Sequence, residues 1–70
     1  MDITEATKKA LKAGGYITRE SWGERFAVYI EPTNTPLCCL VHSMKIKEGP
    51  RPRWNPQAED LIADDWYVLP

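Results

Sequence analysis

Aromatic residues and arginines lie close together at several points of this 70-residue sequence, and their chemistry suits a nucleotide. A purine base stacks on a flat side chain, and each such stack contributes about 1–3 kcal/mol. A pyrophosphate is bound by arginine side chains or by the free amides of a helix N-terminus. The stacking candidates are Trp22, Phe26, Tyr29, Trp54 and Trp66; the cationic candidates are Arg19, Arg25, Arg51 and Arg53; and the ribose or base-edge candidates are Asn55, Asp60 and Asp65.

Each candidate also has a purely structural interpretation. Trp66 comes just before a terminal apolar strand, so we expect it in the core. Trp22 and Trp54 each adjoin turn residues and arginines, and for these two a core position and a ligand contact are equally expected. Asn55 is explained as the N-cap of a helix, and Asp60 and Asp65 as helix-end or solvated carboxylates. Arg51 and Arg53 flank prolines and are expected as surface or interface charges. His42, within an apolar strand, is expected as a hydrogen-bonded structural histidine.

The sequence offers little support for an enzyme. The possible nucleophiles are Ser21, Ser43, Cys38 and Cys39, and His42 falls on the opposite strand face from Cys39. No glycine-rich phosphate loop or metal-ligand pair of cysteines or histidines is present, so no cofactor and no metal are expected. Hydrolysis of a cyclic nucleotide assisted by Asp60 and Asp65 is the weaker enzymatic alternative.

Length and composition predict one domain over residues 1–70 that associates with copies of itself. So short a chain has a small core, and it usually needs a disulfide, a metal or oligomerisation. The two cysteines are adjacent and cannot join separate elements, which leaves a homo-oligomer. A net charge of -1 does not favour a nucleic-acid polymer, and no apolar run is long enough for a membrane span. We therefore expect a protein of a reducing compartment, the cytoplasm.

The expected fold class is α+β, a small antiparallel sheet with an N-terminal helix packed on it and a short C-terminal helix before the last strand. Asp2 caps the first helix, and Gly14-Gly15 end it. Strands are expected at 16–18, 25–32, 37–46 and 66–69, with Phe26, Val28 and Ile30 on one face of the second. Residues 32–36 are expected as a loop, and 47–56 as a turn followed by an edge strand or a loop. Asn55 is the expected N-cap, with Pro56 at the first position of a helix that ends at Ile62.

Two stretches of the sequence, "ALKAGGYITRESW" and "WNPQAEDLIADDWYVL", resemble a family of small phage proteins. These are the Thoeris anti-defence proteins of the second type. The matching positions are Leu11, Lys12, Gly14, Arg19 and Trp22 in the first stretch, and Trp54, Pro56, Asp60, Leu61, Ala63, Asp65 and Trp66 in the second. Between the two stretches this chain is shorter than many relatives.

The resemblance implies a binding protein and not an enzyme. Members of the family form homotetramers that capture a cyclic ADP-ribose isomer made by bacterial TIR-domain proteins, and some also bind cyclic dinucleotides. We therefore expect a sponge for a small cyclic nucleotide in the host cytoplasm, with its pocket between subunits. The expected ligand contacts are Arg19, Trp22, Phe26, Tyr29, Trp54, Asn55, Asp60 and Asp65. A homo-oligomeric protein-interaction module is the main alternative.

Overall fold

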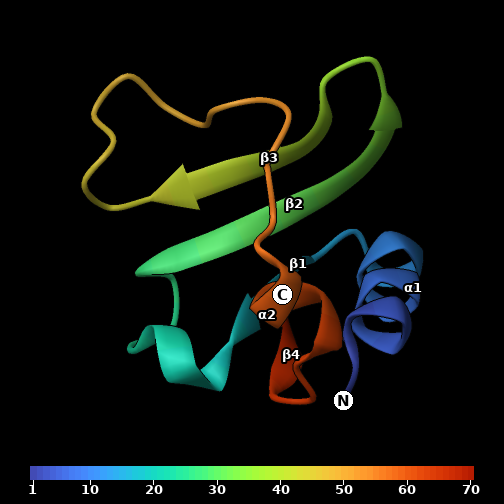
Figure 1. Cartoon of the computed structure of the whole chain (residues 1–70). Coiled ribbons are helices and arrows are strands. Elements are labelled where there is room, and N and C mark those ends of the chain that lie inside the picture. The colour runs from blue at the N-terminus through green and yellow to red at the C-terminus, as the bar shows by residue number, and fades with distance from the viewer.

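A computed structural model describes all 70 residues as a four-stranded sheet with two helices (Figure 1). The elements follow in the order α1 (Ile3–Ala13), β1 (Tyr16–Arg19), the 3-10 turn η1 (Glu20–Trp22), β2 (Val28–Thr35), β3 (Cys38–Ser43), α2 (Ala58–Ile62) and β4 (Trp66–Leu69). The strands lie in the order β3-β2-β1-β4, and every neighbouring pair is antiparallel. The predicted α+β class is confirmed. No helix is both long and apolar enough to cross a membrane.

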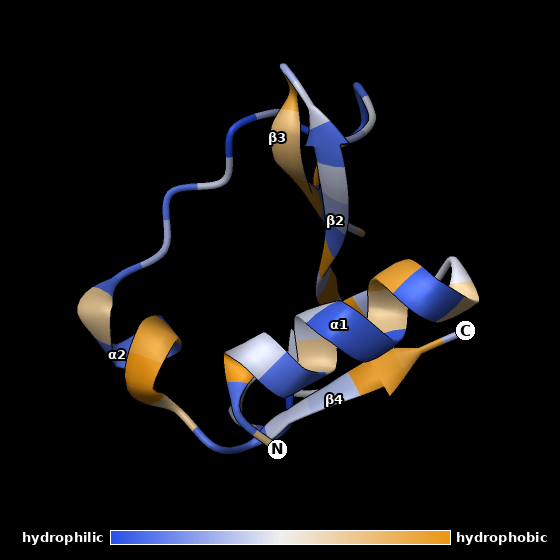
Figure 2. Ribbon diagram, turned by 90° about the vertical axis from the view of Figure 1, so that its right-hand side faces the viewer, coloured by the Kyte–Doolittle hydropathy of each residue, from blue (hydrophilic) through white to orange (hydrophobic).

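The first helix forms as its sequence predicts. Asp2 accepts a hydrogen bond from the backbone N–H of Glu5 at 2.8 Å, and Gly14 ends the helix in the left-handed conformation with φ 70°. Ala6 and Ala10 are fully buried, so the helix lies close to the sheet. Figure 2 shows its polar residues (blue) alternating with apolar residues (tan and orange) along the chain.

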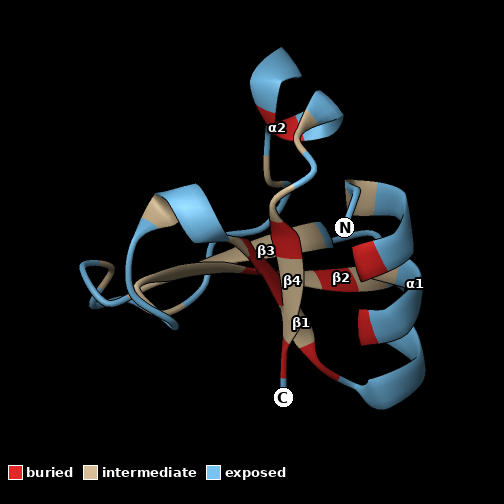
Figure 3. Cartoon of the chain, turned by 90° about the horizontal axis from the view of Figure 1, so that it is seen from below, coloured by how far each residue is buried: buried red, intermediate tan, exposed pale blue.

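The hydrophobic core lies on the face of the sheet that α1 covers. Ile17 of β1 pairs directly with Ile30 of β2, so both side chains lie on one face, and they pack with Trp66 and the two alanines of α1. In Figure 3 buried positions (red) lie on the side of α1 that meets the strands and on the strands beside it, and also in α2. Gly15, at the turn into β1, is required for this contact, because a Cβ there would lie 2.3 Å from the carbonyl oxygen of Leu69.

The opposite face of the sheet carries aromatic side chains. Tyr29 pairs with His42, and their rings stack with centroids 4.7 Å apart and planes 8° apart. Tyr16 contacts both rings edge-on. His42 Nε2 lies 2.8 Å from Glu31 Oε1, so the histidine is hydrogen-bonded within the sheet, as its sequence context predicts.

The hairpin β2–β3 differs from the prediction at both ends. Strand β2 begins at Val28 because Arg25–Ala27 form a turn, and Phe26 has φ 65°. The prediction that Phe26 shares a strand face with Val28 and Ile30 is therefore wrong; its ring contacts Tyr29, on the other face, at 5.4 Å. At the far end β2 continues to Thr35 through the predicted loop, with a register shift between Glu31 and Thr35. Strand β3 ends at Ser43, earlier than predicted.

The segment after β3 returns along its outer edge. Val41 and Arg51 exchange two backbone hydrogen bonds of 2.7 and 2.9 Å, and the N–H of Trp54 donates to Cys39 O at 2.8 Å. This confirms the predicted edge segment, and it covers backbone groups that an open edge would expose.

The start of α2 differs from the prediction by two residues. Gln57 is the N-cap, not Asn55, and the helix begins at Ala58. The reason is a reciprocal capping box: the Asp60 side chain accepts a hydrogen bond from Gln57 N at 2.9 Å, while the Gln57 side chain accepts from the Asp60 backbone. Asn55 and Pro56 lie outside the helix and are exposed.

Candidate functional site

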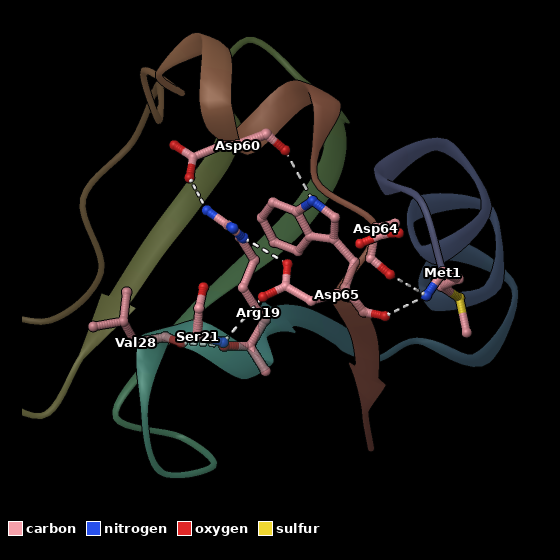
Figure 4. A network of polar contacts seen from close by, with 9 residues as sticks. Met1, Arg19, Ser21, Val28, Asp60, Asp64 and Asp65 are labelled. Carbon is pink, nitrogen blue, oxygen red and sulfur yellow. Dashed lines mark hydrogen bonds and ion pairs between the residues drawn. The ribbon is translucent and has the colours of Figure 1, made fainter.

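Arg19 is the centre of a polar network that joins three parts of the chain (Figure 4). Strand pairing places Arg19 opposite Trp66, next to Asp65. Its Nε donates to Asp65 Oδ1 at 2.8 Å, and its Nη1 donates to Asp60 Oδ1 at 3.0 Å. Only 11 % of the Arg19 side chain is exposed. The network therefore ties the end of β1 to α2 and to the start of β4.

Both carboxylates of this network have further partners within the chain. The second oxygen of Asp65 accepts the backbone N–H of Ser21 at 3.1 Å, and the second oxygen of Asp60 accepts Gln57 N. The Asp60 carbonyl accepts the indole N–H of Trp66 at 2.9 Å. No buried side-chain nitrogen or oxygen of the chain lacks a hydrogen-bond partner. With one cation and two anions the network is negative, so it does not favour a phosphate.

The ion pairs shift the pKa values of Arg19 and Asp65. The hydrogen bond from Arg19 lowers the pKa of Asp65 from 3.8 to about 2; burial opposes this shift and the Ser21 amide adds to it. The hydrogen bond to Asp65 likewise raises the pKa of Arg19. Both groups are charged at neutral pH, so Asp65 is unsuited to act as a general acid there.

The three tryptophans form a single cluster beside this network. Their rings meet edge-on, with centroids 5.1 Å apart for Trp22 and Trp66, 6.0 Å for Trp54 and Trp66, and 6.3 Å for Trp22 and Trp54. Trp66 is 1 % exposed, which confirms it as a core residue, and Trp22 and Trp54 are half-buried against the core. Edge-on packing contributes to stability beyond burial alone.

A hollow of about 390 Å³ opens beside Trp22, the tryptophan at the border of the cluster. It is lined by Trp22, Glu24, Ala27, Val28, Ser43, Met44 and Lys45. Its volume falls in the range of a few hundred Å³ that is usual for small-molecule sites. Met44 lies beyond the end of β3 and is 74 % exposed, so the prediction that it is an ordinary strand residue is wrong. Lys45 makes no ion pair, so its charge is available to an anion.

Two other hollows are less suited to a nucleotide. One, of about 420 Å³, is lined by Met1, Glu20, Asp64, Asp65, Trp66 and Tyr67. It is slightly larger, but its three carboxylates outnumber its one cation, the N-terminal ammonium of Met1, so its charge disfavours a phosphate. The other, of about 130 Å³, lies beside Phe26, Tyr29 and His42 and is too small. No group of three or more His, Cys, Asp or Glu side chains is arranged to hold a metal ion.

The structure divides the predicted contact residues among separate places. Arg19, Asp60 and Asp65 lie together in the polar network, where Arg19 forms an ion pair with each carboxylate. Trp22 and Trp54 lie in the tryptophan cluster, while Phe26 and Tyr29 belong to the aromatic face of the sheet. Asn55 is exposed and lies outside the helix that it was predicted to cap. Of these eight residues, only Trp22 lines the hollow that carries a free cation.

Sequence reasoning missed Met44 and Lys45. The available signal is the abrupt change at "HSMKIK", where an apolar strand gives way to alternating lysines. That change marks the end of β3 and places both side chains at the hollow.

The model of the Thoeris anti-defense 2-like domain matches residues 1–69. The chain belongs to the Thoeris anti-defence 2-like family. The predicted resemblance is thereby confirmed over almost the whole chain, and with it a role in anti-defence. No curated protein and no solved structure matches the chain.

Proposed function

We propose that this family member blocks Thoeris defence by binding a cyclic ADP-ribose-type signalling nucleotide and holding it without cleavage. In the infected cell's cytoplasm this lowers the free concentration of the signal, so its effector stays inactive. The observation that carries the proposal is the hollow lined by both Trp22 and Lys45, a lysine that makes no ion pair. These are the two groups that a purine base and a pyrophosphate require.

The structure favours a different assignment of roles from the one expected from sequence. Trp22 keeps its stacking role, and the exposed thioether of Met44 packs over the other side of the base. Lys45 provides the charge for the phosphates in place of Arg19, whose guanidinium is engaged by two carboxylates. Arg25, exposed in the turn before Ala27, is a second candidate cation.

The proposed mechanism is stoichiometric, and the chain acts as a homo-oligomer, which we propose to be a tetramer. Asp60 and Asp65 are the carboxylates that a hydrolytic mechanism would use, and both are engaged in ion pairs with Arg19. This supports binding over cleavage.

The proposal is tested by following the fate of the ligand. The protein is melted with cyclic ADP-ribose isomers, cyclic dinucleotides and linear ADP-ribose, and the released compound is identified by chromatography. Ligand at a hundredfold its dissociation constant should stabilise the fold by about 2.7 kcal/mol. We expect stabilisation by one cyclic compound and its recovery intact. Cleaved product would show an enzyme, and no stabilisation by any compound would contradict nucleotide binding.

A protein-interaction module is the second candidate, and one observation favours it. Two adjacent apolar residues of α2, Leu61 and Ile62, are exposed to solvent. Such a module shows no change of melting temperature with any nucleotide, which separates it from the sponge.

A further inference from the structure

The hollow beside Trp22 is lined by one acidic side chain as well as one basic side chain. Glu24 and Lys45 both line it, and both are exposed. They make no ion pair with each other or with any other residue, and the Glu24 side chain makes no hydrogen bond within the chain. Both charges of this hollow are therefore available to a ligand.

The backbone fixes where these two side chains begin. Glu24 opens the turn before β2, and its carbonyl accepts the N–H of Ala27 at 3.1 Å. Lys45 follows the end of β3, and its N–H donates to Ser43 Oγ at 3.2 Å. The two segments are joined because the N–H of Met44 donates to Ala27 O at 3.2 Å. Backbone contacts, and not attraction between the two charges, therefore bring Glu24 and Lys45 to one hollow.

A free carboxylate in a nucleotide site is suited to ribose. A carboxylate only accepts hydrogen bonds, and dinucleotide-binding proteins use an Asp or Glu in this way on a ribose hydroxyl. In a cyclic ADP-ribose-type ligand each ribose is bonded directly to a phosphate, so a phosphate held by Lys45 brings a ribose into the same hollow. Asp60 and Asp65, which the sequence suggested for the ribose, are paired with Arg19. The carboxylate that lines this hollow and has no partner is that of Glu24.

We propose that Glu24 sets the specificity of this hollow by accepting hydrogen bonds from a ribose whose two adjacent ring hydroxyls are both free. The proposal rests on nucleotide capture and deepens it. Every cyclic ADP-ribose isomer keeps at least one such ribose, whereas each ribose of a cyclic dinucleotide has one of these hydroxyls esterified. Both kinds of ligand carry two singly charged phosphates, so Lys45 cannot distinguish them. The hydroxyl pair can, and Glu24 makes this hollow a site for ADP-ribose-type nucleotides.

Calorimetric titration with two matched ligands tests this role. The first ligand is the cyclic ADP-ribose isomer that stabilises the wild type most in melting experiments. The second is its dideoxy analogue, in which hydrogen replaces both hydroxyls of the free pair, with one analogue for each pair where the isomer has two. The proteins are the wild type, Glu24→Ala and Glu20→Ala. Glu20 is the matched control, because it is also exposed and makes no ion pair but lines a different hollow.

The quantity compared is the ratio of the two affinities, because removal of a negative charge near the phosphates changes the affinity for both ligands alike. The wild type should bind the complete ligand about tenfold or more tightly than a dideoxy analogue, since hydrogen bonds to a charged group are strong. Glu24→Ala should bring this ratio close to one, and Glu20→Ala should leave it unchanged. Melting without ligand checks that both variants are folded.

The outcomes separate this inference from nucleotide capture itself. If the wild type binds the cyclic nucleotide but Glu24→Ala keeps the wild-type ratio, Glu24 does not read the ribose, and capture stands without it. An equal loss of the ratio in Glu20→Ala would also overturn the assignment, because the effect would then be one of general charge. If the wild type binds no cyclic ADP-ribose isomer, both capture and the role of Glu24 are wrong.

Discussion

At the scale of single residues, the network of Arg19 with Asp60 and Asp65 shows that side chains suited to ligand binding can be used entirely by the fold. The sequence correctly indicates that these residues matter, and all three belong to the family motif. It does not reveal that a residue of β1 and two residues more than 40 positions later come within hydrogen-bond distance. That proximity depends on β1 and β4 being paired.

Asp65 should make stability depend on pH in the acid range. Its folded pKa is about 2 and its ordinary value 3.8, so its contribution is present above about pH 4 and is lost as pH falls toward 2. We expect Asp65→Asn to lower the melting temperature at pH 7 and to flatten the acid decline. The check is a melting series from pH 7 to pH 2. A parallel acid decline in wild type and variant would contradict the assignment.

Cys38 should be replaceable by glycine with a gain in stability. It follows the tight turn at Pro36-Leu37 with φ 61°, in the left-handed region that disfavours residues with a Cβ. We expect Cys38→Gly to stabilise the fold by roughly 0.5–1 kcal/mol in chemical unfolding. Cys38→Ala removes the thiol but keeps the Cβ, so it should give no such gain. Equal effects of the two variants would show that the thiol, and not the backbone, is responsible.

At the scale of elements, the periodic segments were predictable and the irregular ones were not. The capping residues of α1 and the alternation in β2 are local signals, and both elements form. The turn at Phe26 interrupts the alternation of the predicted strand. Helix α2 starts two residues later than predicted, because Gln57 forms the capping box with Asp60 in place of a cap by Asn55. The hollow beside Trp22 is built at such irregular ends of elements, which is why Met44 and Lys45 were missed.

The turn from α1 into β1 should tolerate change at one glycine and not at the other. A Cβ on Gly15 would overlap the Leu69 carbonyl, so we expect Gly15→Ala to destabilise the fold by about 1–3 kcal/mol. Gly14 has open space around it and a left-handed backbone that asparagine also adopts, so Gly14→Asn should have a much smaller effect. Urea unfolding of both variants measures the difference, and similar losses would contradict the close approach of β4.

Trp54 should act mainly as a packing residue that supports the hollow. Its ring contacts Trp22 and Trp66 but does not line the hollow. We expect Trp54→Ala to lower the free energy of unfolding by about 2 kcal/mol, less than for a fully buried tryptophan. A Trp54→Phe variant keeps part of the ring contact, so its free energy of unfolding should lie between those of the wild type and Trp54→Ala. An unchanged stability together with lost nucleotide binding would instead make Trp54 a direct ligand contact.

At the scale of the whole molecule, the sheet has one face that carries the core and one face that carries aromatic side chains. The chain's length and its lack of a disulfide predict self-association, and this stays a prediction. Fold class and family follow from the sequence. Which residues could contact a ligand could not be predicted from the sequence. The sequence does not show that the Arg19 cation is already paired with two carboxylates, whereas the Lys45 cation lines a hollow and makes no ion pair.

The most direct test of the account is calorimetric titration of a cyclic ADP-ribose isomer into the wild type, Lys45→Ala and Lys47→Ala. Both lysines are exposed and make no ion pair, but only Lys45 lines the hollow beside Trp22. We predict that the wild type binds, that Lys45→Ala weakens binding about tenfold or more, and that Lys47→Ala changes it little, since a charge-assisted contact contributes about 1.5–3 kcal/mol. Equal affinities for all three proteins, or no binding by the wild type, would contradict a nucleotide site in this hollow.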